Sequence, residues 1–289
     1  MDSDLQQALL SPPVLALLGL CIGSFLNVVI HRLPAMLERS WKLDSAEMLG
    51  LSGSNVVEVP EKISLAKPPS RCPSCGHAIA WHENIPVLSY LRLKGRCSAC
   101  DARISPRYPL VEIVTGILFA AVGWRFGPQP AVLLWCGLMA VLVVLAGIDW
   151  DTTLLPDSLT LPLLWAGLIA SALGWTAPLS LSQALWGAVV GYLSLWSVYW
   201  MFKLATGKEG MGHGDFKLLA AIGAWLGWQM ILPVVLGASV LGAVVGIAMK
   251  YGKTLREGRY VPFGPFLAGS AVVVLLAGST RVLDWLGWA

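Results

Sequence analysis

Five long stretches of this chain contain no Lys, Arg, Asp or Glu, and they restrict it to folds that lie within a membrane. A helix that crosses the hydrocarbon core of a bilayer needs roughly 20 apolar residues, and each stretch is long enough to supply at least one. Only 13% of the 289 residues are charged, whereas soluble domains average about 25%. The stretches are residues 5–30, 126–148, 158–202, 218–249 and 260–280.

The number of spans follows from where the basic residues lie. Stretch 158–202 is long enough for two spans with a break near 176–183, and 109–124 adds a span that tolerates Glu112. Cytoplasmic loops carry an excess of Lys and Arg, and segment 31–108 holds 11 of the 20 such residues. Eight spans place the basic loops 203–217 and 250–259 on the same side as this segment, whereas seven would leave 250–259 outside.

The sequence therefore predicts an all-α polytopic membrane protein with about eight transmembrane helices. Within 218–249 we expect a short helix at about 216–227, a turn near Gly227–Gln229, and a full span at about 231–249. The chain is expected to divide into a first transmembrane helix (1–31), a cytoplasmic insert (32–108) and a seven-helix membrane core (109–289).

The first apolar stretch is expected to be a signal anchor with its N-terminus outside, because basic residues follow it and none precede it. The lipid bilayer is thus a partner of the chain. The net charge of +3 is too small to indicate nucleic acid binding.

The insert contains two CxxC pairs separated by 21 residues. This spacing is typical of a tetrathiolate zinc site, in which each pair supplies two of four tetrahedral ligands. Disulfides, redox dithiols and unligated cysteines are alternatives, although a cytoplasmic location disfavours disulfides. We expect a structural zinc ion, since an insert of this size has too little core to fold alone. The predicted ligands are Cys72, Cys75, Cys97 and Cys100.

Two aspartates stand at span ends that the topology places on the cytoplasmic side: Asp149 ends the third span and Asp215 begins the sixth. Acidic groups in or beside spans are costly and indicate function. Two neighbouring carboxylates share a proton and can act as base and acid in peptide hydrolysis. The alternatives are that Asp215 is only a helix N-cap, that Asp149 is only a polar span end, or that both are relay groups of a proton-coupled transporter. For Asp157, an N-cap of the fourth helix is the better interpretation.

Gly212 and Gly214 flank His213 directly before Asp215. Glycine removes side-chain bulk, so another backbone or an extended peptide can approach closely. Asp215 would also lie at a helix N-terminus, where the helix dipole favours a negative charge.

In the cysteine pairs, the two aspartates and the glycines before Asp215, the chain resembles the type IV prepilin leader peptidases. These enzymes are also N-methyltransferases and belong to the GxGD intramembrane aspartic proteases. The matching order of motifs runs nearly from end to end. Besides the four cysteines, it comprises residues 23–34, 83–86, 107–112, 148–149, 155–157, 208–217 and 262–265.

The resemblance implies that Asp149 and Asp215 are the catalytic pair and that the four cysteines hold zinc. It implies an endopeptidase of the bacterial inner membrane that removes the basic leader of prepilins and pseudopilins at the cytoplasmic face. The new N-terminus would then be methylated with S-adenosylmethionine. Substrate contacts are expected from Gly212, Gly214 and Glu112. No glycine-rich dinucleotide fingerprint follows a strand, so the residues that bind S-adenosylmethionine stay unassigned.

Overall fold

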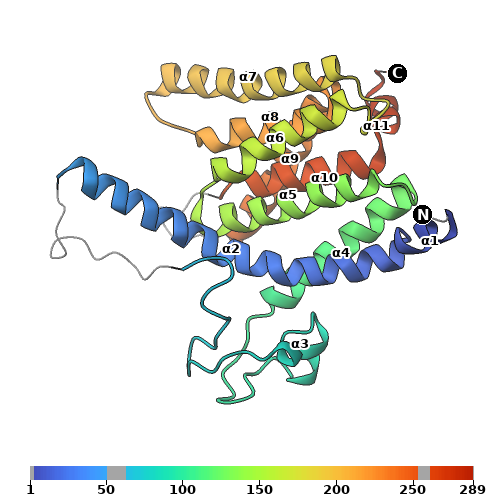
Figure 1. The fold of residues 1–289 in the computed structure, drawn as a ribbon. Coiled ribbons are helices and arrows are strands. Elements are labelled where there is room, and N and C mark those ends of the chain that lie inside the picture. Colours follow the sequence, from blue (N-terminus) through green and yellow to red (C-terminus); the bar gives the residue numbers. More distant parts are fainter. Residues whose placement is uncertain (1–2, 51–62, 253–260, 289) are drawn as a thin grey trace. The chain divides into compact units, whose positions relative to one another are not determined.

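Each of the uncharged stretches forms one or two α-helices in the computed structural model, which describes residues 3–50, 63–252 and 261–288 (Figure 1). The first part of the chain contains α1 (Ser3–Leu9), α2 (Pro12–Met48), η1 (Trp81–Glu83), α3 (Leu88–Arg92) and α4 (Arg107–Phe126). The second part contains α5 (Val132–Thr152), α6 (Asp157–Ala172), α7 (Leu181–Thr206), α8 (His213–Leu226), η2 (Trp228–Met230), α9 (Ile231–Tyr251), α10 (Gly264–Ala277) and α11 (Ser279–Leu286).

Five helical segments in the described residues are long and apolar enough to cross a membrane. A sixth is obtained if α10 and α11, which meet at an angle of 100°, form one broken span. The all-helical, polytopic membrane fold is thus confirmed. The predicted spans correspond to α2 and to α4 through α10, but α6 and α8 have only 16 and 14 residues, so the count of eight spans stays a prediction. The five segments are Pro12–Met48, Arg107–Phe126, Val132–Thr152, Leu181–Thr206 and Trp228–Tyr251.

The helix ends lie close to their predicted positions. The break between α6 and α7 spans residues 173–180. Helix α8 ends at Leu226 and is followed by Gly227, whose φ of +84° is in the region that favours glycine. The short helix begins at His213 rather than near 216, because the extended Gly212 already serves as its N-cap. Asp215 is therefore inside the first turn, and the N-cap interpretation of this residue is wrong.

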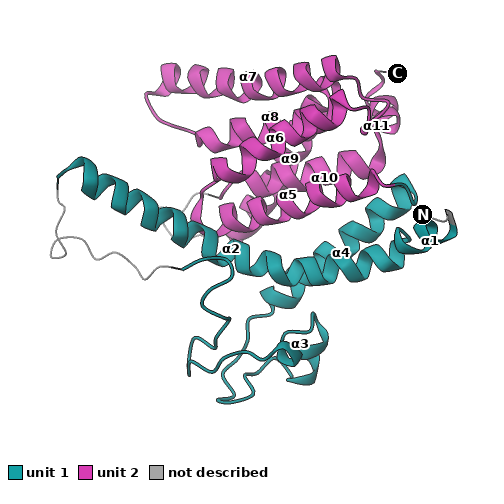
Figure 2. Ribbon diagram, viewed as in Figure 1, with its two compact units in different colours: residues 1–129 teal, residues 130–289 magenta. Residues whose placement is uncertain are grey.

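Contacts divide the chain into two units (Figure 2). Unit 1 comprises residues 1–129 and unit 2 comprises residues 130–289. The three-part division predicted above describes the path through a membrane, which this grouping does not test, and it stays a prediction.

In unit 1, α2 and α4 approach closely through small residues. A Cβ added at Gly19 would lie 2.8 Å from the Cα of Gly116, and one at Gly23 would lie 2.7 Å from the Cα of Glu112. Two glycines spaced by four residues form the small-residue surface on which membrane helices pack. This contact fixes Glu112 against the first long helix.

In unit 2, the same spacing occurs on α7 and packs that helix against α8. A Cβ at Gly191 would lie 2.6 Å from the carbonyl oxygen of Leu219, and one at Gly187 would overlap the backbone of Gly223. The two backbones therefore touch, which holds α8 in a defined place.

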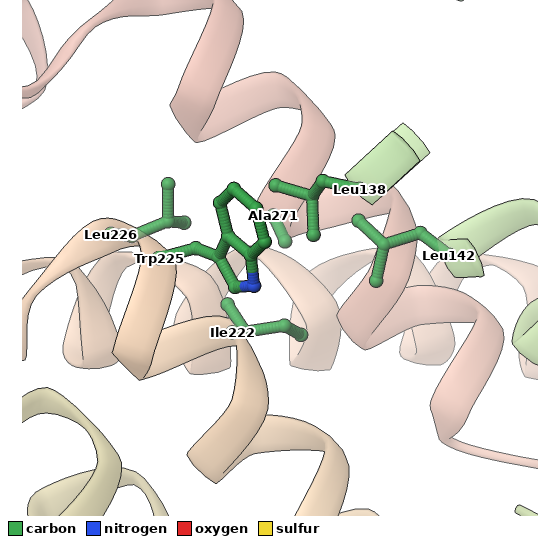
Figure 3. A pocket seen from close by; sticks show the side chains of 6 residues that line it. All are labelled: Leu138, Leu142, Ile222, Trp225, Leu226 and Ala271. Atoms are coloured by element: carbon green, nitrogen blue, oxygen red, sulfur yellow. The ribbon is translucent and has the colours of Figure 1, made fainter. Parts of the chain in front are cut away.

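Helices α5, α8 and α10 meet around an apolar pocket that leaves no room for a water molecule (Figure 3). The indole of Trp225 stands among aliphatic side chains from all three helices, and its Nε1 donates a hydrogen bond to the carbonyl of Leu163 at 2.9 Å. Dense apolar packing of this kind holds helices rigidly, and these three helices carry the polar groups described next. The pocket is lined by Leu138, Leu142, Ile222, Trp225, Leu226 and Ala271.

Candidate active site and metal centre

Asp149 lies in the last turn of α5 with its side chain almost fully enclosed. Only 4% of the residue is exposed. Its Oδ2 accepts a hydrogen bond of 3.0 Å from the backbone N–H of Gly264, which is 115 positions away in the sequence and is the first residue of α10. The helix N-terminus leaves this N–H without a partner inside α10, so the carboxylate and the helix end satisfy each other.

Asp215 is the third residue of α8 and is 7% exposed. Its carboxylate accepts a hydrogen bond from the backbone of Gly212, and its charge interacts with that of Asp149. The structure thus brings together the two aspartates that the sequence paired. A pair of interacting buried carboxylates is the arrangement in which one proton can be held between two groups, as the sequence analysis expected.

Three glycines surround the pair, and each has a specific neighbour. A Cβ at Gly264 would lie 2.5 Å from Asp149 Oδ2, and one at Gly214 would lie 2.8 Å from the Cβ of Leu155. A Cβ at Gly212 would lie 3.8 Å from Asp215 Oδ2, an ordinary contact distance. Steric exclusion is therefore strong at Gly264 and Gly214 and weak at Gly212.

Asp157 is not the N-cap of α6, contrary to the sequence prediction. The extended Pro156 occupies that position and Asp157 is the first helical residue. Its carboxylate instead forms an ion pair with Lys217 of α8, with both oxygens 2.7 Å from Nζ. The pair joins the start of α6 to the turn of α8 that carries Asp215.

The loop before α8 is held by a polar and aromatic cluster. Lys203 donates hydrogen bonds to Glu209 at 2.9 Å and to Tyr199 at 3.1 Å, and the lysine holds the pKa of Glu209 below its usual value. The His213 ring packs on Tyr199 and Phe216, with centroids 5.0 and 5.4 Å apart. These contacts connect the end of α7 to the beginning of α8 and so support the Asp215 turn.

The four cysteines of the insert converge on one point in unit 1. Their sulfur atoms all lie within 4.8 Å of one another, and Cys72 Sγ lies 3.8 Å from Cys100 Sγ. A tetrahedron with Zn–S bonds of about 2.3 Å has edges of about 3.8 Å. The donor set and its spacing therefore fit a zinc ion.

Each cysteine pair lies in the same kind of turn. The N–H of Cys72 donates to the carbonyl of His77, and the N–H of Cys97 donates to that of Ala102, both at 2.9 Å. The residue after each pair, Gly76 and Asp101, has positive φ, at +73° and +56°. These matching turns aim both pairs of thiols at the same place.

A hydrogen-bonded link joins the two turns. The Glu83 carboxylate lies 3.2 Å from His77 Nε2 in the first turn, and Ser98 of the second turn bonds to both. The hydroxyl of Ser98, the N–H of Ala80 and His77 together lower the pKa of Glu83 to about 2. Glu83 thus stays ionised and acts as an acceptor for both turns.

Glu112 is buried in unit 1, with 7% of the residue exposed. Its Oε2 accepts a hydrogen bond of 2.8 Å from the N–H of Val87, and its carboxylate also bonds to Ser24 of α2. Val87 has the unusual φ of +59°. Glu112 therefore holds the loop that follows Glu83, and its predicted contact with substrate stays a prediction.

Sequence reasoning missed the partners that hold the aspartates. The block at residues 262–265 contributed to the resemblance, but no pattern predicted that Gly264 would donate to Asp149. Lys217 and Asp157 carry opposite charges, yet their 60-residue separation gave no sign of pairing.

Comparison with known proteins finds a family match within each of the two units. Residues 17–126 match the family model described as the bacterial peptidase A24 N-terminal domain, and residues 136–247 match that of the type IV leader peptidase family. No solved structure matched the chain.

Curated relatives match almost the full length of the chain. A protein of Stutzerimonas stutzeri is 52% identical over 94% of this chain and 92% of its own. One of Pseudomonas aeruginosa is 50% identical over the same shares, and one of Aeromonas salmonicida is 51% identical over 91% and 90%. All three are named prepilin leader peptidase/N-methyltransferase. With this identity over nine-tenths of the sequence, the chain belongs to the type IV leader peptidase family.

Proposed function

We propose that this protein is a membrane-embedded aspartic endopeptidase that removes the leader of type IV prepilins and pseudopilins and then methylates the new N-terminus. The observation that carries the proposal is the pair of buried, interacting carboxylates of Asp149 and Asp215. Both lie within the segment that matches the leader peptidase family model. The named activity of the relatives supports the same reaction.

The pair hydrolyses the peptide bond by moving protons in a closed cycle. The ionised carboxylate takes a proton from water while the water oxygen bonds to the scissile carbonyl carbon, and the protonated carboxyl gives its proton to the carbonyl oxygen. The tetrahedral diol then loses its C–N bond as the first carboxyl protonates the nitrogen and the second recovers a proton from the diol. The pair ends with one shared proton, as it began.

The surroundings of the pair suit an extended substrate with a basic leader. Gly212 is exposed and has open space beside it, which lets a peptide backbone approach the Asp215 carboxylate. Gly214 is partly exposed but packs against Leu155, and we include it among the groups that contact substrate, as predicted from the sequence. Asp151, exposed at the end of α5, adds negative charge near Asp149. We include Glu112 among the groups that contact substrate, as predicted from the sequence.

The methyl donor in this proposal is S-adenosylmethionine, which supplies an electrophilic methyl group to the amine that cleavage exposes. The name N-methyltransferase of the relatives supports this step. We assign no residues to its site.

A structural zinc ion held by Cys72, Cys75, Cys97 and Cys100 completes the proposal. The fit of the four sulfur atoms to a tetrahedron supports it. The metal would stabilise an insert that has little core of its own.

We further propose an inner-membrane location with the N-terminus outside and the aspartates at the cytoplasmic face. The basic loops 31–108, 203–217 and 250–259 support this orientation. The last of these lies largely outside the described residues.

A proton-coupled transporter was the alternative use of the same carboxylates. Nothing in the comparisons supports it, and both aspartates lie in the end turns of their helices rather than midway along them.

The test is to incubate the purified protein in lipid with a purified prepilin, with and without S-adenosylmethionine, and to weigh the product. Loss of the leader establishes the peptidase, and a further gain of about 14 Da, from one CH₃ in place of a hydrogen on the amine, establishes methylation. An intact prepilin after exposure to folded enzyme contradicts the proposal.

A further inference from the structure

We infer that Gly264 is a positioning residue of the peptidase, whose backbone N–H fixes the orientation of the Asp149 carboxylate, and that the site tolerates only glycine there. This inference rests on the function proposed above. Gly264 lies within the block 262–265, for which the sequence suggested no role.

The hydrogen bond itself is the first argument. The donor and acceptor are 3.0 Å apart in a buried environment and come from different helices. A buried hydrogen bond to a charged group is among the stronger ones in a protein. It engages Oδ2 of Asp149 and so restricts rotation of the carboxylate.

The position of Gly264 in its helix is the second argument. It is the first residue of α10, a helix of 14 residues, so its N–H is one of those that have no partner within the helix. The positive end of the α10 dipole therefore acts on Asp149, just as the start of α8 acts on Asp215. Each carboxylate of the pair lies at the N-terminus of a different helix, and both ends favour the negative charge that the pair must keep.

The third argument is steric. A Cβ at position 264 would lie 2.5 Å from Asp149 Oδ2, 3.2 Å from its Cγ and 3.3 Å from Leu155 Cδ1. Distances below 3.0 Å require something to move, and here the group that moves is the carboxylate that must remain aligned. Because φ at Gly264 is not in the positive region, this requirement for glycine is one of space and not of backbone conformation.

The experiment compares Gly264→Ala with Gly269→Ala, five residues further along the same helix. A Cβ at Gly269 meets nothing within 4 Å, so this variant makes the same chemical change without the contact. We expect Gly264→Ala to lower kcat for leader removal about 100-fold, the usual effect of a displacement of about 1 Å at a catalytic group. KM should stay within about twofold, since the substrate does not bind through Gly264. Gly269→Ala should behave as wild type.

A stability cycle keeps the inference testable even if Gly264→Ala folds poorly. Gly264→Ala should destabilise the wild-type protein more than it destabilises Asp149→Ala, where the colliding carboxylate is absent. Equal destabilisation in both backgrounds, or a wild-type kcat in Gly264→Ala, overturns the inference. Either result leaves the peptidase proposal intact, whereas failure of the wild-type enzyme to cleave prepilin contradicts that proposal itself.

Discussion

At the scale of single residues, the site depends on carboxylates that the fold removes from water. Asp149 and Asp215 are each less than 10% exposed, and each has a backbone N–H as its neighbour. A buried carboxylate without such partners would be strongly disfavoured as an anion. The two helix ends therefore make it possible for the pair to hold one negative charge inside the protein.

Replacing either aspartate with asparagine should abolish leader removal. Asparagine has almost the same shape but cannot accept a proton, so the closed proton cycle stops, and we expect a loss of about 10²–10⁴-fold in kcat. Cleavage is measured by the mobility shift of the pilin. Methylation of a pre-cleaved pilin serves as the control for folding, and substantial cleavage by either variant would contradict the shared role.

The pairing of the two aspartates was predictable from the sequence, but the hydrogen bonds and ion pair that hold them in position were not. Asp149 directly follows one uncharged stretch and Asp215 lies three residues before another. The topology puts both positions on one side, so the sequence contains the information needed to pair them. The hydrogen bond from Gly264 comes from a backbone group, which has no signature in a sequence. The ion pair of Asp157 with Lys217 requires knowing that the starts of α6 and α8 are adjacent.

At the scale of helices, the close packing of α7 on α8 sets the position of the helix that carries Asp215. Gly187 and Gly191 are the positions where the two backbones meet. The helices themselves could be predicted from charge-free length. The helix pairs that pack together could not be predicted, because small residues allow a close approach but do not indicate which helix lies opposite.

Gly187→Ala should reduce the amount of folded protein in the membrane, because the added methyl would overlap the backbone of Gly223. Overpacking of this kind costs about 1–3 kcal/mol or more. Thermal unfolding in detergent provides the measurement. Gly246→Ala in α9, where a Cβ meets nothing within 4 Å, is the matched control, and equal stability of the two variants would argue against the contact.

The turns that carry the cysteines should bind about one zinc ion per chain, measured by metal analysis of the purified protein. Cys72→Ser should lose that metal, since serine is a poor zinc ligand, while Cys21→Ser in α2 should keep it. Removal of zinc should also make the insert more sensitive to protease, because metal binding supplies its folding energy. A stable, active and metal-free protein would refute the structural role.

At the scale of the whole molecule, the fold class was predictable from the uncharged stretches, whereas the number of crossings depends on the charges of the loops. Uncharged stretches require helices, because only helices and closed barrels satisfy backbone groups in lipid. Helices α6, α8 and α10 are too short for length alone to decide whether each crosses. The positive-inside rule decides the number of spans instead, because the basic loop 250–259 lies on the cytoplasmic side only if there are eight.

A reporter fused after Arg259 should be active in the cytoplasm. This position lies outside the described residues and follows the seventh predicted span, so an odd number of earlier crossings separates it from an external N-terminus. A periplasmic signal would show that the eight-span topology is wrong.

Two of the helices around the aspartate pair are short, and this has a consequence for the surrounding lipid: α8 carries Asp215, and α10 begins with the N–H that binds Asp149. Helices α8 and α10 have 14 residues each, or about 21 Å at 1.5 Å per residue, against a hydrocarbon thickness of about 30 Å. Such mismatch is relieved when the bilayer thins locally, which brings water and headgroups toward buried carboxylates that need water to react. The length of the lipid acyl chains should thus influence the rate of leader removal. We expect leader removal to slow in vesicles made of progressively longer lipids, and a rate independent of thickness would show that these helices do not meet the bilayer in this way.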